Sequence, residues 1–153
     1  MTEDSLGRDP LTGLNCRWYV LHELERHINL YKRYRRPFSL LLIRFDNVEW
    51  VKDASGDAAG ESALEYLTTI IETHLRDVDI VSRCSADEFA VIMQETDKQA
   101  AQTAGRRIAD SLEKTRIKVG EDFVTMRASF GTASCPEDGL EAEALLKVAG
   151  THL

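Results

Sequence analysis

The chain has 153 residues, 43% hydrophobic and 29% charged, with 9 glycines and 3 prolines, which fits one globular domain and excludes disordered and collagen-like chains. Its 26 acidic and 19 basic residues give a net charge of −7, which argues against general electrostatic binding of nucleic acid or of an anionic membrane. The 3 cysteines show no pattern of a disulfide frame or zinc site, and the longest apolar run, Leu40 to Ile43, is too short to span a bilayer. We therefore expect a single cytoplasmic domain over 1–153, without bound metal, nucleic acid partner or membrane insertion.

Hydrophobic periodicity predicts the elements of the first half of the chain. Apolar residues at helical spacing predict a helix from Tyr19 to Tyr31, followed by a basic run that ends at Pro37. The nearly continuous apolar run from Phe38 to Phe45 predicts a strand that is buried on both faces. A second amphipathic helix is expected from Ala63, ending near Arg76.

The second half of the chain alternates in the same way. Two short segments rich in Val, Ile and Phe, separated by a loop of hairpin length, predict a β-hairpin over 79–94. Asp97 is a typical N-cap residue and predicts a helix to about Glu113. An extended region over 117–133 and a last helix from Glu141 complete the chain. The order predicts an α/β (α+β) fold, with a mostly antiparallel central sheet surrounded by helices.

Three motifs carry a resemblance to a known family. They are Asp9-Pro10-Leu11-Thr12-Gly13-Leu14, Arg83-Cys84-Ser85-Ala86-Asp87-Glu88-Phe89 and Ser129-Phe130-Gly131-Thr132-Ala133. In their order and spacing the chain resembles a GGDEF domain, the nucleotidyl-cyclase-like fold of bacterial diguanylate cyclases. The resemblance covers nearly the whole chain. Active members of that family join two GTP molecules into cyclic di-GMP, with divalent metal ions to neutralise the triphosphates.

The resemblance also implies that the metal site is altered. Arg44 stands at the first metal-binding aspartate of the family, and a guanidinium cannot coordinate a cation. Asp87 remains as the second carboxylate. Two arrangements stay open for these residues, an ion pair between Arg44 and Asp87 or two separately solvated side chains.

The nucleotide-binding part of the former active site departs from the family as well. Its positions, together with the metal site, are Arg44, Lys52, Glu61, Ser85, Ala86, Asp87 and Glu88. Ser85 and Ala86 replace two glycines, and the added β-carbons restrict the loop and crowd a phosphate. Lys52 replaces the asparagine that reads guanine and has no acceptor, while Glu61 is a milder replacement for aspartate. We therefore expect no catalytic residues, no cofactor and no cyclase activity.

A second site of the family is matched by residues of this chain. Arg76-Asp77-Val78-Asp79 ends six residues before Ser85, as in the RxxD inhibitory site at which GGDEF domains bind their product, and Arg107 matches the arginine that completes it. Arginine forks bind guanine O6 and N7 and stack on bases, and a carboxylate accepts from guanine N1 and N2. We predict that Arg76, Asp79 and Arg107 bind cyclic di-GMP. The open alternative is a surface salt bridge that binds nothing.

These inferences predict a catalytically inactive GGDEF domain that acts as a receptor for cyclic di-GMP. The ligand is expected as a stacked pair that can link two domains, so that association with a protein partner, a fused sensor or output domain, or a second copy responds to it. One alternative is a ligand-independent protein-interaction or dimerisation module, and another is a GTP-binding regulatory domain or weak diguanylate cyclase. The basic run over 32–36 is either a solvated helix end or a docking patch for an acidic partner. Whether the chain is a piece of a longer signalling protein also stays open.

Overall fold

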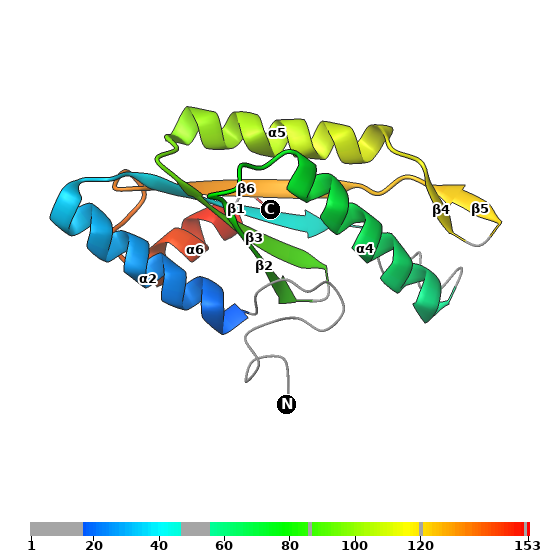
Figure 1. Cartoon of the computed structure of the whole chain (residues 1–153), viewed down its shortest axis with the longest axis horizontal. Coiled ribbons are helices and arrows are strands. Elements are labelled where there is room, and N and C mark those ends of the chain that lie inside the picture. The colour runs from blue at the N-terminus through cyan, green and yellow to red at the C-terminus, as the bar shows by residue number, and fades with distance from the viewer. Residues whose placement is uncertain (1–16, 47–55, 86, 120, 152) are drawn as a thin grey trace.

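The computed structural model describes residues 17–46, 56–85, 87–119, 121–151 and 153 (Figure 1). Its helices and strands are, in chain order, α2 (Arg17–Tyr34), β1 (Phe38–Phe45), α4 (Asp57–Thr73), β2 (Ile80–Ser85), β3 (Glu88–Gln94), α5 (Lys98–Lys114), β4 (Ile117–Val119), β5 (Asp122–Val124), β6 (Ala128–Cys135) and α6 (Ala142–Thr151). The motif over 9–14, Lys52, Ala86 and Gly120 lie outside the described residues.

A four-stranded sheet with the order β2-β3-β1-β6 forms the centre of the molecule, and each pair of neighbours is antiparallel. The β2–β3 ladder loses its regular register between Arg83 and Ser85, next to the hairpin turn. β4 and β5 form a separate two-stranded sheet. The predicted fold, a mixed α/β domain with a mostly antiparallel sheet surrounded by helices, is confirmed.

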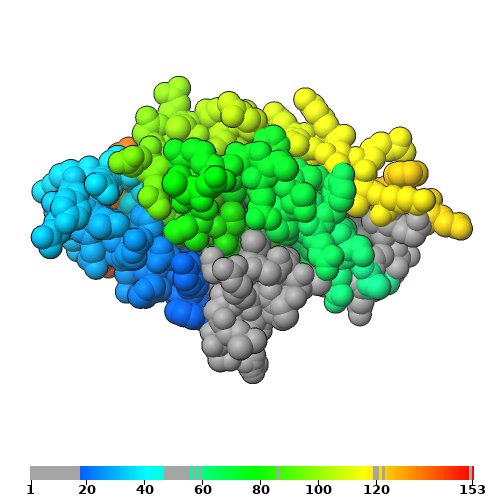
Figure 2. All heavy atoms as spheres, viewed as in Figure 1, coloured from blue at the N-terminus to red at the C-terminus, as the bar shows by residue number. Residues whose placement is uncertain are grey.

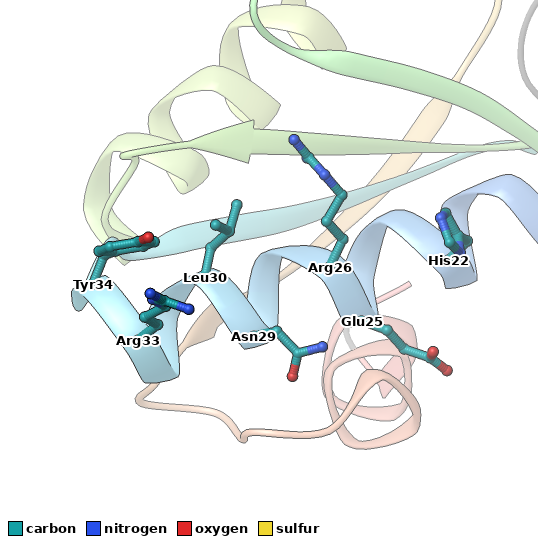
Figure 3. A pocket seen from close by; sticks show the side chains of 7 residues that line it. All are labelled: His22, Glu25, Arg26, Asn29, Leu30, Arg33 and Tyr34. Atoms are coloured by element: carbon teal, nitrogen blue, oxygen red, sulfur yellow. The ribbon is translucent and has the colours of Figure 1, made fainter.

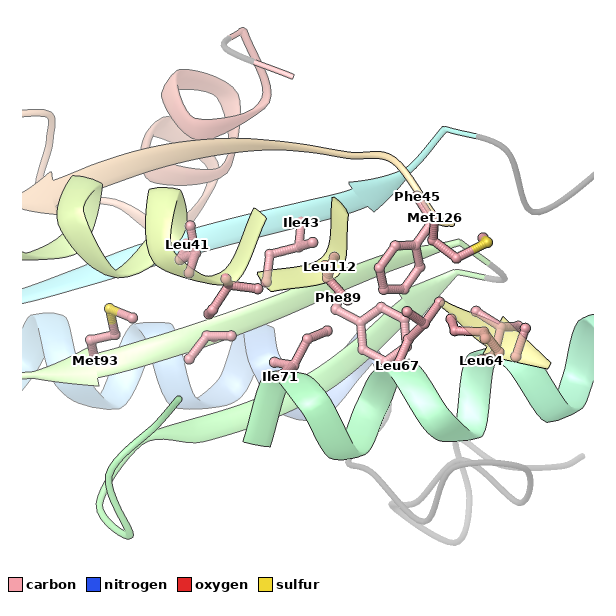
Figure 4. Packing of buried hydrophobic residues seen from close by; sticks show 14 of the residues in the cluster. Leu41, Ile43, Phe45, Leu64, Leu67, Ile71, Phe89, Met93, Leu112 and Met126 are labelled. Carbon is pink, nitrogen blue, oxygen red and sulfur yellow. The ribbon is translucent and has the colours of Figure 1, made fainter. Parts of the chain in front are cut away.

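β1 is buried on both faces because successive side chains of a strand point to opposite sides of the sheet. One side chain set packs under α4 and α5, and the other under α2 and α6. The first set contains Leu41, Ile43 and Phe45, and the second contains Phe38, Leu40 and Leu42. Figure 4 shows the first cluster, in which Phe45 and Phe89 meet edge to face with ring centroids 5.4 Å apart.

α4 and α5 lie side by side over one face of the sheet (Figure 1), and their surfaces adjoin in the space-filling view (Figure 2). The predicted N-cap of α5 is confirmed, since Asp97 Oδ1 accepts a hydrogen bond from the backbone N–H of Ala100 at 2.8 Å. The described residues contain no helix that is both long enough and apolar enough to cross a membrane.

The prediction that the second helix ends near Arg76 is wrong by three residues, because α4 ends at Thr73. His74 N–H and Leu75 N–H bond to carbonyls three residues back, which tightens the last turn. The backbone N–H of Arg76 then bonds to the side chain of Asp79, so the helical ladder cannot continue through it. α2 is longer than predicted at both ends and reaches Tyr34.

Candidate functional site

Arg76 and Asp79 close the turn that follows α4. Asp79 Oδ2 accepts from the backbone N–H of Arg76 at 2.8 Å, and Asp79 Oδ1 accepts from Arg76 Nη2 at 3.0 Å. The Asp79 side chain is only 3% exposed, whereas that of Arg76 is 54% exposed. The carboxylate is therefore an interior support of the turn, and the guanidinium is the part that meets solvent.

The same guanidinium connects this turn to the end of β3. Arg76 Nη2 donates to the backbone carbonyl of Gln94 at 2.7 Å and to Thr96 Oγ1 at 2.8 Å. The side-chain amide of Gln94 donates back to the carbonyl of Val78, inside the turn, at 3.4 Å. Three segments that are separate in the sequence thus meet at Arg76: the turn after α4, the end of β3 and the residues that lead into α5.

Arg107 lies on the exposed surface of α5, about 15 Å along the helix from Asp97 at the usual rise of 1.5 Å per residue. Gly105 faces Phe130 of β6, and Ala104, three residues before Arg107, packs against the cluster shared with α4. Arg107 therefore lies on the flank of α5 that turns away from β6. Among the described residues no hydrogen bond or ion pair joins Arg107 to Arg76 or Asp79.

Four of the residues predicted for the former active site, Arg44, Ser85, Asp87 and Glu88, lie at one end of the sheet. Arg44, at the end of β1, lies opposite Glu88 of β3 and Ser129 of β6 in the strand register. Ser85 and Glu88 pair across the hairpin. The backbone carbonyl of Asp87 accepts from Phe45 N–H at 2.9 Å.

The ion pair between Arg44 and Asp87, one of the two arrangements considered, is not formed. Arg44 Nε lies 3.7 Å from Asp46 Oδ1, and Arg44 Nη2 donates to the carbonyl of Leu153 at 3.3 Å. Asp87 Oδ1 instead accepts from Ser85 Oγ at 3.3 Å. Asp46 is two residues further along the same strand end, so its side chain leaves the sheet on the same side as that of Arg44.

Of the other positions predicted for the former active site, the structure describes Glu61, which is exposed near the start of α4. Within 17–46, 56–85, 87–119, 121–151 and 153, no three or more His, Cys, Asp or Glu side chains cluster in a way that could hold a metal ion.

Sequence reasoning missed the polar residues behind Arg76. Thr96 is 8% exposed, and its backbone carbonyl accepts from Ser39 Oγ at 2.7 Å. Ser39 Oγ also lies 2.8 Å from Ser134 Oγ of β6. The available signal was a serine, Ser39, near the start of the strongly apolar strand β1, because buried hydroxyls require hydrogen-bonding partners.

The family model described as diguanylate cyclase, GGDEF domain, matches residues 7–153. The chain belongs to the GGDEF family. This GGDEF domain is 29% identical over 145 residues to the cyclic di-GMP phosphodiesterase NbdA of Pseudomonas aeruginosa, and 33% identical over 126 residues to the probable diguanylate cyclase DgcC of Escherichia coli K12. These alignments cover 95% and 82% of this chain, but only 18% of NbdA and 34% of DgcC.

Solved GGDEF domains share the fold. The GGDEF domain of TpbB (YfiN) from Pseudomonas aeruginosa superposes with a TM-score of 0.89 at 28% identity, over 95% of this chain and 85% of that one. Diguanylate cyclase SiaD from the same organism, in complex with its activator SiaC, gives 0.88 at 27% identity, over 98% and 57%. The GGDEF domain of DgcB from Caulobacter crescentus, in complex with c-di-GMP, gives 0.88 at 18% identity, over 95% and 84%, which shows the shared fold alone.

Proposed function

We propose that this GGDEF domain is a receptor for cyclic di-GMP that binds through Arg76 and Arg107, with Asp79 supporting Arg76 from behind, and that does not synthesise the nucleotide. The observation that carries the proposal is the state of Arg76. Its guanidinium is 54% exposed, yet it is fixed from behind by Asp79, Gln94 and Thr96. A half-exposed cation on a fixed support suits an anionic ligand, because little side-chain freedom is lost on binding.

The chemistry of the ligand fits the two arginines. Cyclic di-GMP has two phosphates and two guanine Hoogsteen edges, which accept from guanidinium groups, and its base planes stack on them. Arg76 is held in place by its hydrogen bonds to the protein. Arg107 is exposed and has no hydrogen bond or ion pair among the residues that the structure describes.

The proposed loss of cyclase activity rests on Arg44. By family resemblance this residue occupies a metal-binding position, and in the structure its positive charge is held there by Asp46 and by the carbonyl of Leu153. A divalent cation beside this guanidinium is disfavoured by charge repulsion. We therefore expect that the end of β1 does not hold the divalent cation that the cyclase reaction requires.

Isothermal titration of cyclic di-GMP tests the receptor function. We expect the wild-type chain to bind one or two ligands per domain, and Arg76→Ala to weaken binding by at least about tenfold, the usual cost of losing a charge-assisted hydrogen bond. Arg107→Ala is expected to weaken binding too. Arg106→Ala is the matched control, because Arg106 is also exposed on α5 but lies on a different flank. An absence of heat and of any ligand-dependent thermal shift in the wild type overturns the proposal.

Incubation of the chain with GTP and Mg²⁺ or Mn²⁺, followed by chromatography, tests the loss of cyclase activity. We expect no cyclic di-GMP, with an active GGDEF cyclase as the positive control. Formation of cyclic di-GMP, or metal-dependent binding of GTP, favours the alternative of a GTP-binding regulatory domain or weak diguanylate cyclase.

The outer face of α2 favours a second candidate function, a ligand-independent interaction or dimerisation module. A shallow hollow there is lined by His22, Glu25, Arg26, Asn29, Leu30, Arg33 and Tyr34 (Figure 3). Arg33 and Arg36 lie 5.3 Å and 5.5 Å from the centroid of the Tyr34 ring, which belongs to a residue that is 54% exposed. Exposed Tyr and Arg side chains are frequent anchors at protein interfaces. Self-association that is lost in Tyr34→Ala and unchanged by cyclic di-GMP supports this candidate.

A further inference from the structure

Arg76 has an uneven distribution of hydrogen bonds. The two N–H groups of its Nη2 face three acceptors, Asp79 Oδ1, the Gln94 carbonyl and Thr96 Oγ1, at 2.7 to 3.0 Å, so one N–H is shared between two of them. Its Nη1 and Nε have no hydrogen-bonding partner in the part of the chain that the structure describes. One edge of the guanidinium is thus held by the protein, while the remaining donors and the planar face stay available to a ligand.

The hydroxyl of Thr96 is oriented to accept. It donates its single proton to the Gln94 carbonyl at 2.9 Å, so that only its lone pairs face Arg76 Nη2. Between these residues Glu95 has a φ of 48°, in the left-handed region, and its N–H bonds to the Pro37 carbonyl at 2.9 Å. This turn brings the Gln94 carbonyl and the Thr96 hydroxyl to the same nitrogen of Arg76.

The support of Thr96 is itself fixed. Thr96 is 8% exposed, and its carbonyl is bonded to Ser39 of β1, which in turn contacts Ser134 of β6. The hydroxyl that holds Arg76 therefore belongs to a buried residue that is bonded to the end of the sheet where β1 begins.

We infer that Thr96 is a positioning residue of the cyclic di-GMP site: its hydroxyl holds Arg76 by Nη2, with the other donors and the guanidinium plane turned to the ligand. This inference rests on the proposed receptor function. Thr96 does not touch the ligand; it acts through Arg76. Without the hydroxyl, Arg76 samples more rotamers before binding, and that freedom is lost again when the ligand binds.

The test is a titration of cyclic di-GMP into Thr96→Val and Thr96→Ser, with a thermal melt of each variant. Thr96→Val keeps the shape and removes the hydroxyl, and we expect its affinity to fall on the order of fivefold. Thr96→Ser keeps the hydroxyl and is expected to bind within about twofold of the wild type. Thr68→Val is the matched control, because Thr68 is equally buried, at 4% exposure, but bonds to the Leu64 carbonyl within α4. It is expected to leave the affinity unchanged.

Each outcome is decisive. Unchanged binding by Thr96→Val, an equal loss in Thr96→Ser, or an equal loss in Thr68→Val overturns the positioning role. The receptor function stands in these cases if Arg76→Ala still weakens binding by at least about tenfold. Tighter binding by Thr96→Val also overturns the positioning role, because that result means that the hydroxyl competes with the ligand for Arg76. If the wild type does not bind, both proposals fall. If Thr96→Val does not fold, Thr96→Ala replaces it, because it removes the hydroxyl without placing a second methyl against the Gln94 carbonyl.

Discussion

The aromatic ring of Phe130, in β6, lies against the backbone of Gly105, in α5, with no room for a methyl group between them. A β-carbon on Gly105 would lie 2.7 Å from Phe130 Cε2, closer still to Phe130 Cδ2, and 3.0 Å from Leu41 Cδ1. The glycine allows α5 to approach β1 and β6 closely, and it thereby sets the height of the helix above the sheet.

Gly105→Ala is accordingly expected to destabilise the domain. The overpacking cost of roughly 1–3 kcal/mol exceeds the gain of about 1 kcal/mol from the higher helix propensity of alanine, so we expect the free energy of unfolding to fall by about 1 kcal/mol. Urea denaturation measures it. Gly150→Ala in α6 is the control, because nothing lies within 4 Å of the position of its β-carbon. A stability loss as large in Gly150→Ala would contradict the explanation.

Arg35→Gly is expected to stabilise the domain by about 0.5–1 kcal/mol, because a left-handed conformation strains every residue except glycine. Arg35 follows α2 with a φ of 58°, and its N–H bonds to the Tyr31 carbonyl at 2.7 Å, the arrangement of a left-handed helix cap. Arg36→Gly removes the same charge without that strain and is expected to give no gain. Equal stabilities for the two variants in urea denaturation would refute the prediction.

Asp79→Ala is expected to lower both stability and ligand affinity. It removes the acceptor of the Arg76 backbone N–H and one of the three acceptors of Nη2, which should cost about 1–2 kcal/mol in the free energy of unfolding. Asp77→Ala removes the same formal charge from the same turn at an exposed position and serves as the control. Thermal melts measure the stability of both variants, and titrations with cyclic di-GMP measure their affinity. An Asp79→Ala chain that matches Asp77→Ala in both measurements shows that the turn does not depend on this carboxylate.

Cys135 gives the domain a pH dependence at alkaline pH. Burial raises the pKa of its thiol above the ordinary value of 9.0, with Glu137 acting in the same direction and Lys32 against it. The folded state therefore keeps the thiol proton to higher pH than the unfolded chain. The resulting stability is fully present below pH 9.0 and is lost as the pH rises through the folded pKa.

Urea denaturation at about pH 8 and about pH 10 measures this effect. The loss of stability between the two values is expected to be smaller in Cys135→Ala than in the wild type, because the variant has no thiol to ionise. An undiminished loss in Cys135→Ala would assign the alkaline sensitivity to other groups.

The elements that could be predicted from sequence are those decided by local pattern. The apolar run from Phe38 to Phe45 is long enough and bounded clearly enough to identify the central strand, and its bounds agree with the structure. Asp97 identifies the start of α5 because an N-cap acts on amides only three residues away. The hairpin was also confirmed, because its two strands pair with a short loop between them.

The features that could not be predicted depend on side chains from separate segments. The end of α4 was misplaced because Asp79 captures the backbone amide of Arg76, and nothing in a helical period encodes that capture. Thr96 was not singled out because its role exists only when a turn twenty residues earlier lies against the end of β3. The pairing of Arg44 with Asp46 is not among the predicted arrangements, an Arg44–Asp87 ion pair or two solvated side chains, because it depends on the side-chain direction at the end of β1.

The irregular register between Arg83 and Ser85 has a consequence for how the domain can meet a second copy of itself. β2 is an edge strand, and a regular edge offers unpaired amides and carbonyls on which another chain can add a strand. A register shift bends the strand and interrupts that row at the hairpin end. Continuation of the sheet from one copy to the next is therefore disfavoured there, and side-chain surfaces remain for reversible association.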